Sequence, residues 1–538
     1  MSCSKIFSGD LPELTYEIIK YFQNDISTLH SCILVNRLWC RLAIPLLWKD
    51  PFSFRTGNCN FIEIYLHNLN DDLKSKLSEY KINDNSLIPS NTLFNYAKFL
   101  KYLNIFDIIS CVEMWFEVAV RTSKPGNRYF LKDLNSYSVS NFKKLINISL
   151  FKIFIENEIN LHTLEIEISS TYYYTYFNNI LEIILQNTNF IHNIKNLNLY
   201  INSPFNFSYA NSNSEYKLIK NRISQIINLH QNIKKILLYY DNFPLYQSLL
   251  LSKDSNCSNT LNTIIFYCID FKGITNLDKI FKQLNVLESI HIIYCYSLKS
   301  GFDQFINLTK PFKLKSLIIN ELSHVDKSLQ LLLQKSGNYL ENFGYILGDL
   351  SQQRQLLELI TKYCKNIKYL DFYEFESQII YQIFNLSNLI EHIKQNLNYL
   401  SINIWEDYYL SNGNIERSSI LLQNLGQTLP SKLEYLSLIL SIKENDFRIF
   451  LENSQNTFIN KLKIMQNNSD DIVQCIKGFI INKKRVNYLA IRNFKGGDLS
   501  CLKDEVKEFN LHNIRVLNFN DLSLAFDVYN LVRKIDYL

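Results

Sequence analysis

Glycine and proline are scarce in this chain, which has 13 glycines and 9 prolines among 538 residues. Typical usage would be about 7% glycine and 5% proline, so collagen-like and glycine-loop architectures are excluded, and an all-β chain with many tight turns is disfavoured. Apolar residues are plentiful: 47% of the chain is hydrophobic and 14% is aromatic, which excludes wholesale disorder. Because the length exceeds what one compact core accommodates, the sequence predicts several domains or an extended repeat.

A strong excess of one charge is also missing, since 56 Lys and Arg residues face 51 Asp and Glu residues. Proteins that bind nucleic acid or a membrane surface usually carry a concentrated basic stripe. The densest basic cluster here, residues 483–485, is short and has acidic residues nearby, as is typical of a solvated face. We therefore expect neither nucleic acid nor a membrane among the partners.

The 11 cysteines form no CxxC pair, and none lies beside a histidine at the spacing of zinc ligands. This pattern indicates reduced thiols and predicts no metal and no cofactor. The first ten residues lack the apolar region of a secretory signal, and the most apolar stretch, residues 106–120, is interrupted by acidic residues. We expect a soluble intracellular protein, in the cytoplasm, the nucleus or both.

Catalytic motifs are missing as well. The sequence contains no G-x-S-x-G, no P-loop and no H-E-x-x-H motif, and its nine histidines are scattered. Glu165 and Glu167 lie on one face of an expected strand, but such a pair is far more often exposed strand charge than a pair of catalytic carboxylates. We therefore expect that the chain is not an enzyme.

An internal repeat is the strongest pattern that is present. Its motif is an apolar residue, two variable residues, an apolar residue, one variable residue and an apolar residue. Most successive motifs start about 27 residues apart, within the roughly 20–29 residues of a leucine-rich repeat. The motif occurs thirteen times, at residues 161–166, 194–199, 233–238, 261–266, 287–292, 314–319, 340–345, 367–372, 397–402, 433–438, 459–464, 486–491 and 514–519.

The residues between motifs predict one amphipathic helix per unit, as in Leu329, Leu332 and Leu333, with Gly337 behind them as a C-cap. A strand and a helix that cannot bury their apolar sides alone would stack on their neighbours, which predicts an α/β fold, a right-handed leucine-rich-repeat solenoid. A parallel barrel or a doubly wound domain has a similar period. Thirteen units exceed the eight of a barrel, however, and no glycine-rich phosphate loop follows any expected strand.

The amino-terminal segment 11–48 predicts a small module of helices, ahead of the repeats. Pro12 suits a first helical turn, Ser27 or Thr28 is expected as the N-cap of a second helix, and Pro45 is expected to start or kink a last one. From periodicity alone, this module could be a cap that shields the first repeat from solvent.

The residues of this module resemble an F-box. The resemblance rests on the opening Leu-Pro, the run from Cys32 to Trp39 that contains Val-Asn-Arg-Leu-Trp, and the closing Leu-Trp at residues 47–48. It implies binding to a Skp-type adaptor and, through it, to the cullin scaffold of a ubiquitin ligase. The combination with carboxy-terminal repeats resembles the fungal F-box/leucine-rich-repeat proteins. The positions that the resemblance marks as adaptor-contacting or motif-defining are Leu11, Pro12, Ile18, Leu29, Val35, Trp39 and Trp48.

These patterns divide the chain into three parts: an F-box-like helical module over residues 8–52, a helical linker or cap over residues 53–141, and a solenoid of about thirteen units over residues 142–538. Within the linker, we expect helices over residues 61–80 and 93–121. The linker would set the distance between the adaptor and the repeats.

Recognition of a protein would fall to the concave face of the solenoid. The apolar motif residues face inward, so the strand period of two places the intervening residues on the concave sheet. Tyrosine recurs there at one offset, which could form a binding ladder or merely cover neighbouring strands; tyrosine suits interface anchoring. The substrate-binding candidates on this face are Tyr369, Asp371, Tyr373, Tyr399, Tyr435, Lys461, Lys463, Tyr488 and Arg492.

Two hypotheses about function follow. In the first, the chain is the substrate receptor of a Skp–cullin–F-box type ubiquitin ligase, with the module bound to the adaptor and the concave face bound to a protein substrate. In the second, it is a leucine-rich-repeat scaffold or sensor without a ubiquitin role, and its first module is only a cap. Identity of the substrate is beyond the sequence, because repeat surfaces recognise partners through particular side chains.

Overall fold

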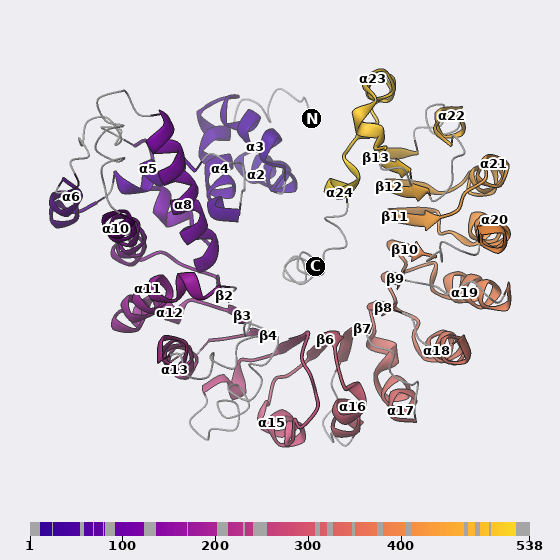
Figure 1. Cartoon of the computed structure of the whole chain (residues 1–538), viewed down its shortest axis with the longest axis horizontal. Helices are drawn as coiled ribbons and strands as arrows, with labels where there is room; N and C mark the ends of the chain where they lie inside the picture. Colours follow the sequence, from indigo (N-terminus) through magenta and orange to yellow (C-terminus); the bar gives the residue numbers. More distant parts are fainter. Residues whose placement is uncertain are drawn as a thin grey trace. The chain divides into compact units, whose positions relative to one another are not determined.

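The computed structural model (Figure 1) contains two compact units, one formed by Met1–Asn262 with Gln283–Val286 and the other by Thr263–Lys282 with Leu287–Leu538. The expected solenoid 142–538 is therefore divided between both units. The structure describes residues 11–23, 25–53, 59–67, 69–78, 80, 92–122, 136–168, 170–201, 214–229, 232–239, 256–306, 313–319, 327–346, 350–373, 380–404, 411–466, 472–478, 485–493 and 497–522.

The first unit begins with helices and continues as alternating strands and helices. Its amino-terminal elements are α2 (Pro12–Tyr21), α3 (Ile26–Ile33), α4 (Arg37–Leu47), η1 (Pro51–Ser53), α5 (Phe61–Leu66), α6 (Asp71–Ser78) and η2 (Tyr96–Phe99). The alternating part contains β1 (Tyr102–Asn104), α8 (Ile105–Thr122), α10 (Ser136–Glu156), β2 (Thr163–Ile168), η3 (Thr171–Tyr173), α11 (Tyr174–Gln186), α12 (Asn189–His192), β3 (Asn196–Ile201), α13 (Ser214–Leu229), β4 (Lys235–Tyr239) and η6 (Asn256–Asn259).

Strands β1 to β4 form a parallel sheet in the order of the sequence. One carbonyl at the start of each strand accepts hydrogen bonds from two consecutive N–H groups of the next strand. Lys101 O, for example, accepts from His162 N at 2.9 Å and from Thr163 N at 3.0 Å. These paired bonds fix the register, so motif residues of successive units lie side by side and their apolar side chains stack into one continuous core.

The second unit alternates a strand with a helix or turn throughout. Its elements are β5 (Thr263–Tyr267), α15 (Leu277–Gln283), β6 (Ser289–Cys295), α16 (Leu298–Ile306), β7 (Lys313–Ile319), α17 (Lys327–Ser336), η7 (Gly337–Tyr339), β8 (Asn342–Ile346), α18 (Leu350–Tyr363), β9 (Tyr369–Tyr373), α19 (Ile380–Ile393), β10 (Tyr399–Asn403), α20 (Ser411–Thr428), β11 (Lys432–Leu440), α21 (Glu444–Asn453), β12 (Phe458–Gln466), α22 (Val473–Ile476), β13 (Val486–Asn493), η9 (Leu499–Cys501), α23 (Lys503–Leu511), β14 (Arg515–Val516) and α24 (Phe519–Leu522).

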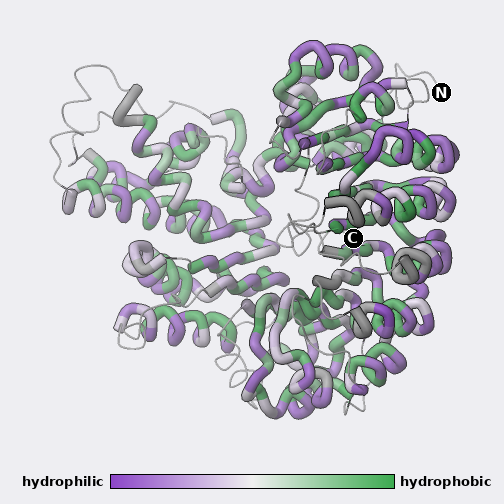
Figure 2. The backbone as a smooth tube through the Cα atoms, turned by 45° about the vertical axis from the view of Figure 1, so that its right-hand side comes forward, coloured by the Kyte–Doolittle hydropathy of each residue, from purple (hydrophilic) through white to green (hydrophobic). Residues whose placement is uncertain are grey.

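In this unit strands β5 to β14 are parallel and follow sequence order, and helices α15 to α21 cover one face of the sheet (Figure 1). Hydrophobic and hydrophilic residues alternate along the helices (Figure 2), as amphipathic packing on a sheet requires. In α17, for instance, Leu329, Leu332 and Leu333 are buried. We call the sheet face opposite the helices the concave face.

All thirteen sequence motifs overlap strands β2 to β14, which confirms the repeating α/β pattern. The linker was predicted incorrectly at one point. Residues 102–104 lie inside the helix expected over residues 93–121, but they form β1 and pair with Thr163, Leu164 and Glu165 of β2. The expected helix over residues 61–80 is two shorter helices, α5 and α6.

Gly337 follows α17 and begins the turn η7. A Cβ atom at this position would lie 2.9 Å from the Tyr363 carbonyl oxygen and 3.1 Å from Cys364 Sγ. Close approach of the next repeat explains the glycine. Among the described residues, no helix combines the length and the apolar character needed to cross a membrane.

Candidate protein-binding surfaces

The three helices of the amino-terminal module enclose a small core of their own. Its buried members are Ile19, Leu29, Cys32, Trp39 and Ala43. Two of the helices begin at strong side-chain caps. Asp25 Oδ1 accepts a hydrogen bond from Thr28 N at 3.1 Å, and Asn36 Oδ1 accepts one from Trp39 N at 2.9 Å. The expected N-cap at Ser27 or Thr28 is therefore wrong by two or three residues, because the Asp25 side chain accepts the capping hydrogen bond just ahead of them.

The turn between α3 and α4 exposes two consecutive apolar side chains. Leu34 is 77% exposed and Val35 is 49% exposed, although turns of this kind usually carry polar residues or glycine. Further exposed apolar residues of the module are Leu14, Tyr16, Tyr21 and Ile26. Covering apolar groups of this size lowers the free energy of the system, because it removes their surface from water. This surface therefore suits a protein partner.

The end of the module is built into the first unit. The ring of Trp48 lies 4.2 Å from that of Tyr96 and 5.4 Å from that of Tyr65, measured between centroids. The carbonyl of Lys49 accepts hydrogen bonds from the N–H groups of Lys101 and Tyr102, in the same paired arrangement that joins successive strands. The module therefore continues the hydrogen-bonding pattern of the repeats at the edge of β1.

The seven predicted adaptor-contacting residues fall into two groups. Leu29, Trp39 and Trp48 are buried, so they stabilise the module and its attachment. The others, Leu11, Pro12, Ile18 and Val35, are partly or largely exposed. Pro12 occupies the first turn of α2, and Pro45 lies inside α4 rather than at its start.

On the concave face, the strand register places the predicted tyrosines in one row. Tyr369, Tyr399 and Tyr435 are register partners on β9, β10 and β11, and the row continues through Lys461 to Tyr488. The rings of Tyr369 and Tyr399 are 6.4 Å apart. Tyr373 ends β9, but its side chain lies outside the described ones.

A charged cluster occupies the next row of the same face. Burial raises the pKa of the Asp371 carboxyl to about 6, although hydrogen bonds from Ser401 and Tyr369 and the charge of Lys463 act in the opposite direction. The Tyr369 hydroxyl lies 3.3 Å from Asp371 Oδ2. Burial and the nearby charge of Arg492 lower the pKa of Lys463 to about 8. The cluster thus combines a carboxyl and an ammonium group that water solvates poorly.

The carboxy-terminal end of the described chain covers part of this face. Tyr435, Ala490 and Leu522 form a buried cluster, with Tyr399, Tyr488 and Leu517 packed against it. The ring of Phe519 lies 4.0 Å from Lys463 Nζ and 4.8 Å from Arg492 Cζ, measured to its centroid. Three of the predicted substrate-binding residues, Tyr435, Lys463 and Arg492, therefore contact residues 519–522 of the same chain.

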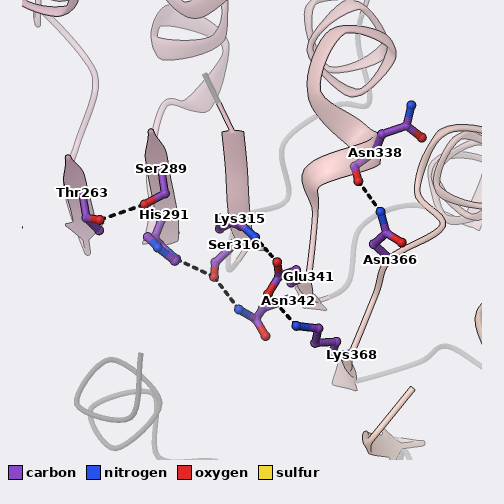
Figure 3. A network of polar contacts seen from close by, with 10 residues as sticks. All are labelled: Thr263, Ser289, His291, Lys315, Ser316, Asn338, Glu341, Asn342, Asn366 and Lys368. Atoms are coloured by element: carbon purple, nitrogen blue, oxygen red, sulfur yellow. Dashed lines mark hydrogen bonds and ion pairs between the residues drawn. The ribbon is translucent and has the colours of Figure 1, made fainter. Parts of the chain in front are cut away.

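A polar network that sequence reasoning missed extends the tyrosine row toward β5 (Figure 3). Ser316 Oγ lies 2.7 Å from His291 Nδ1 and accepts a hydrogen bond from Asn342 Nδ2 at 2.8 Å. Asn342 is in turn the register partner of Tyr369. Ser316 and Asn342 occupy the same motif offset as the tyrosines, so that offset could have identified them. The Ser316 side chain is fully buried, which closes its hydroxyl to a substrate.

Glu165 departs from the expectation of exposed strand charge. Its side chain is fully buried, and it accepts hydrogen bonds from the Tyr102 hydroxyl, from Asn104 Nδ2 at 2.7 Å and from Asn198 Nδ2 at 3.3 Å. These donors come from the neighbouring strands β1 and β3, which the sequence does not reveal as neighbours of Glu165. The carboxylate therefore joins three strands of the first unit.

Within the part of the chain that the structure describes, no three His, Cys, Asp or Glu side chains come together as metal ligands would. No model of a known protein family matches this chain, and no curated protein matches it. A chain in the crystal structure of the Rad7 and Elc1 complex in yeast is similar to it, with 16% sequence identity and a TM-score of 0.35, over 70% of this chain and 82% of that chain. We draw no functional conclusion from so distant a likeness.

Proposed function

We propose that this protein is a substrate receptor of a Skp–cullin–F-box type ubiquitin ligase. In this proposal the helices α2 to α4 bind a Skp-type adaptor, and the concave face of the second unit binds a protein substrate. The chain contributes no catalytic step; its ligase partners transfer ubiquitin to the bound substrate.

The observation that carries the proposal is the exposed apolar turn at Leu34 and Val35. It belongs to the run that resembles an F-box, and the caps at Asp25 and Asn36 fix the helices on both sides of it. A turn that only connected two helices would gain solubility from polar residues. Exposed apolar residues in a turn held between two capped helices instead favour binding with little loss of conformational entropy.

Co-elution with a purified Skp-type adaptor in size-exclusion chromatography tests the proposal. We expect the unmutated chain to co-elute, and the double variant Leu34→Asp/Val35→Asp to bind at least about tenfold more weakly, because charge must then be desolvated in the interface. Leu511→Asp is the matched control, since Leu511 in the second unit is 75% exposed, close to the 77% of Leu34. It should bind as the unmutated chain does.

Failure of the unmutated chain to co-elute would refute the ligase proposal. Circular dichroism of the double variant should match that of the unmutated chain, because both substituted side chains are exposed. A double variant that binds the adaptor normally would place the contact elsewhere and contradict the role of this turn.

A scaffold or sensor without a ubiquitin role is the second candidate, and one observation favours it. The Lys49 carbonyl pairs with the first strand as each repeat pairs with the next, which is what an amino-terminal cap does. A cap accounts for Trp48 and Lys49, whereas it gives no reason for the exposed Leu34 and Val35. The chromatography above distinguishes the two, because a cap binds no adaptor.

A further inference from the structure

The carboxy-terminal segment, residues 517–522, packs onto the concave face through two side chains. Phe519 is buried with its ring centroid 4.0 Å from Lys463 Nζ and 4.8 Å from Arg492 Cζ, and Leu522 is buried against Tyr435 and Ala490. The two anchors are three positions apart on the single turn of helix α24, so they project from the same side of it. The segment thus covers the charged cluster with one aromatic and one aliphatic group.

Polar contacts orient the segment. Phe519 N donates a hydrogen bond to Asp498 Oδ2 at 3.0 Å, and Arg492 Nη1 donates one to Asn520 Oδ1 at 3.4 Å. Arg492 also forms an ion pair with Asp498, in which Nη2 and Oδ2 are 3.6 Å apart. Upstream, Leu517 N donates to the Leu489 carbonyl at 2.9 Å, which continues the pairing between β13 and β14.

A purely structural cap does not require a buried lysine beneath Phe519. Burial of Lys463 beside Arg492 opposes the charged state of the lysine and lowers its pKa to about 8, and an aliphatic residue at this position would pack under Phe519 without that cost. Cations held close to a ring instead provide selective recognition of aromatic groups. Two neighbouring cations, Lys463 and Arg492, beneath the segment are typical of a binding site rather than of a core.

We propose that the concave face over β11 to β13 is a peptide-binding site that residues 517–522 occupy within the same chain. Its partner is a protein segment that carries an aromatic residue followed, three positions later, by an aliphatic one. The aromatic ring contacts Lys463 and Arg492, and the aliphatic side chain lies on Tyr435 and Ala490. Binding of the partner requires displacement of the carboxy-terminal segment.

This inference concerns the face that we propose for the substrate, but it does not require adaptor binding. The adaptor test uses the module in the first unit, whereas the test below uses residues of the second unit. A negative result in the adaptor test therefore leaves the peptide-binding test interpretable, and a negative result in the peptide-binding test leaves the adaptor test interpretable.

A labelled peptide with the sequence of residues 516–524, VLNFNDLSL, is the probe, and fluorescence anisotropy measures its binding to the full-length chain. The unmutated chain should bind it weakly, because its own segment occupies the site. The full-length variant Phe519→Ala/Leu522→Ala should bind it at least about tenfold more tightly. The control Asp521→Ala changes an exposed residue of the same turn and should bind as weakly as the unmutated chain.

A second peptide, in which alanine replaces the residues equivalent to Phe519 and Leu522, measures selectivity. It should bind the double variant at least about tenfold more weakly than the native peptide does. Addition of Lys463→Met to the double variant should reduce binding of the native peptide severalfold, because one of the two cations is lost.

Equal binding of the two peptides would overturn the proposal, since the face would then select neither the aromatic nor the aliphatic residue. Unchanged weak binding by a folded double variant would overturn it as well. If the double variant loses its cooperative thermal transition, the single variant Phe519→Ala, which keeps the Leu522 anchor, replaces it in the binding measurement. Loss of that transition in both would show that the segment is an obligatory part of the fold, which also contradicts displacement.

Discussion

Asp371 shows how one residue on the concave face links stability to pH. Burial raises the pKa of its carboxyl to about 6 from an ordinary value of 3.8. Between these two pH values the folded state binds more protons than the unfolded state, so stability falls as pH rises from 4 to 6. Well above pH 6 the cost of the buried charge is fully present.

The variant Asp371→Asn removes that cost. We expect its free energy of unfolding, relative to the unmutated chain, to increase by about 1–3 kcal/mol between pH 4 and pH 7.5, the upper figure following from a shift of roughly two pKa units. Urea denaturation at the two pH values measures this difference. An equal difference at the two pH values would contradict the buried charge.

At the scale of elements, the helices α2 to α4 combine a surface role and a structural role in different residues. Trp48 packs on Tyr96 and Tyr65, whereas Leu34 and Val35 face solvent. Truncation of a buried tryptophan removes its contacts and leaves a cavity, at a typical cost of about 3–5 kcal/mol. Trp48→Ala should therefore lower the stability of the first unit, while Leu34→Asp/Val35→Asp should leave it within about 0.5 kcal/mol.

The substitution removes the Trp48 fluorophore, so unfolding of Trp48→Ala should be followed by circular dichroism rather than by tryptophan fluorescence. Limited proteolysis adds a local readout, because the Lys49 carbonyl and the β1 amides separate when the packing of Trp48 is lost. An unchanged transition in Trp48→Ala would mean that the module is attached by other contacts than those of its last helix.

The strands could be predicted from the sequence because each places apolar residues at a fixed offset against the same helical layer. Residues 102–104 could not, since three residues within a long apolar run carry no period of their own, and only pairing with β2 makes them a strand. The tyrosine row followed from the offset alone. The burial of Tyr435 against Leu522 depends on a contact between distant parts of the chain, which no local pattern indicates. The buried Glu165 was misjudged for the same reason.

At the scale of the whole molecule, a chain of repeats distributes stability through neighbours. Within each unit a helix packs on the helices before and after it, and each strand pairs with adjacent strands, so the effect of a local defect should decline with distance along the repeats. The two compact units each have their own large buried residues, among them Phe154 in the first and Phe450 in the second.

Two truncations, one in each unit, test whether a defect stays local to its unit. Phe154 packs on Tyr65 and Phe52 in the first unit, and Phe450 stacks on Phe447 in the second. Phe154→Ala and Phe450→Ala should each cost about 3–5 kcal/mol locally. Hydrogen exchange read by mass spectrometry should then rise near β1 to β3 in the former and near β11 to β13 in the latter, with little change in the other unit. A rise of similar size in both units for either variant would instead show that the chain unfolds as one cooperative body, and a defect in one unit would then weaken adaptor binding and peptide binding together.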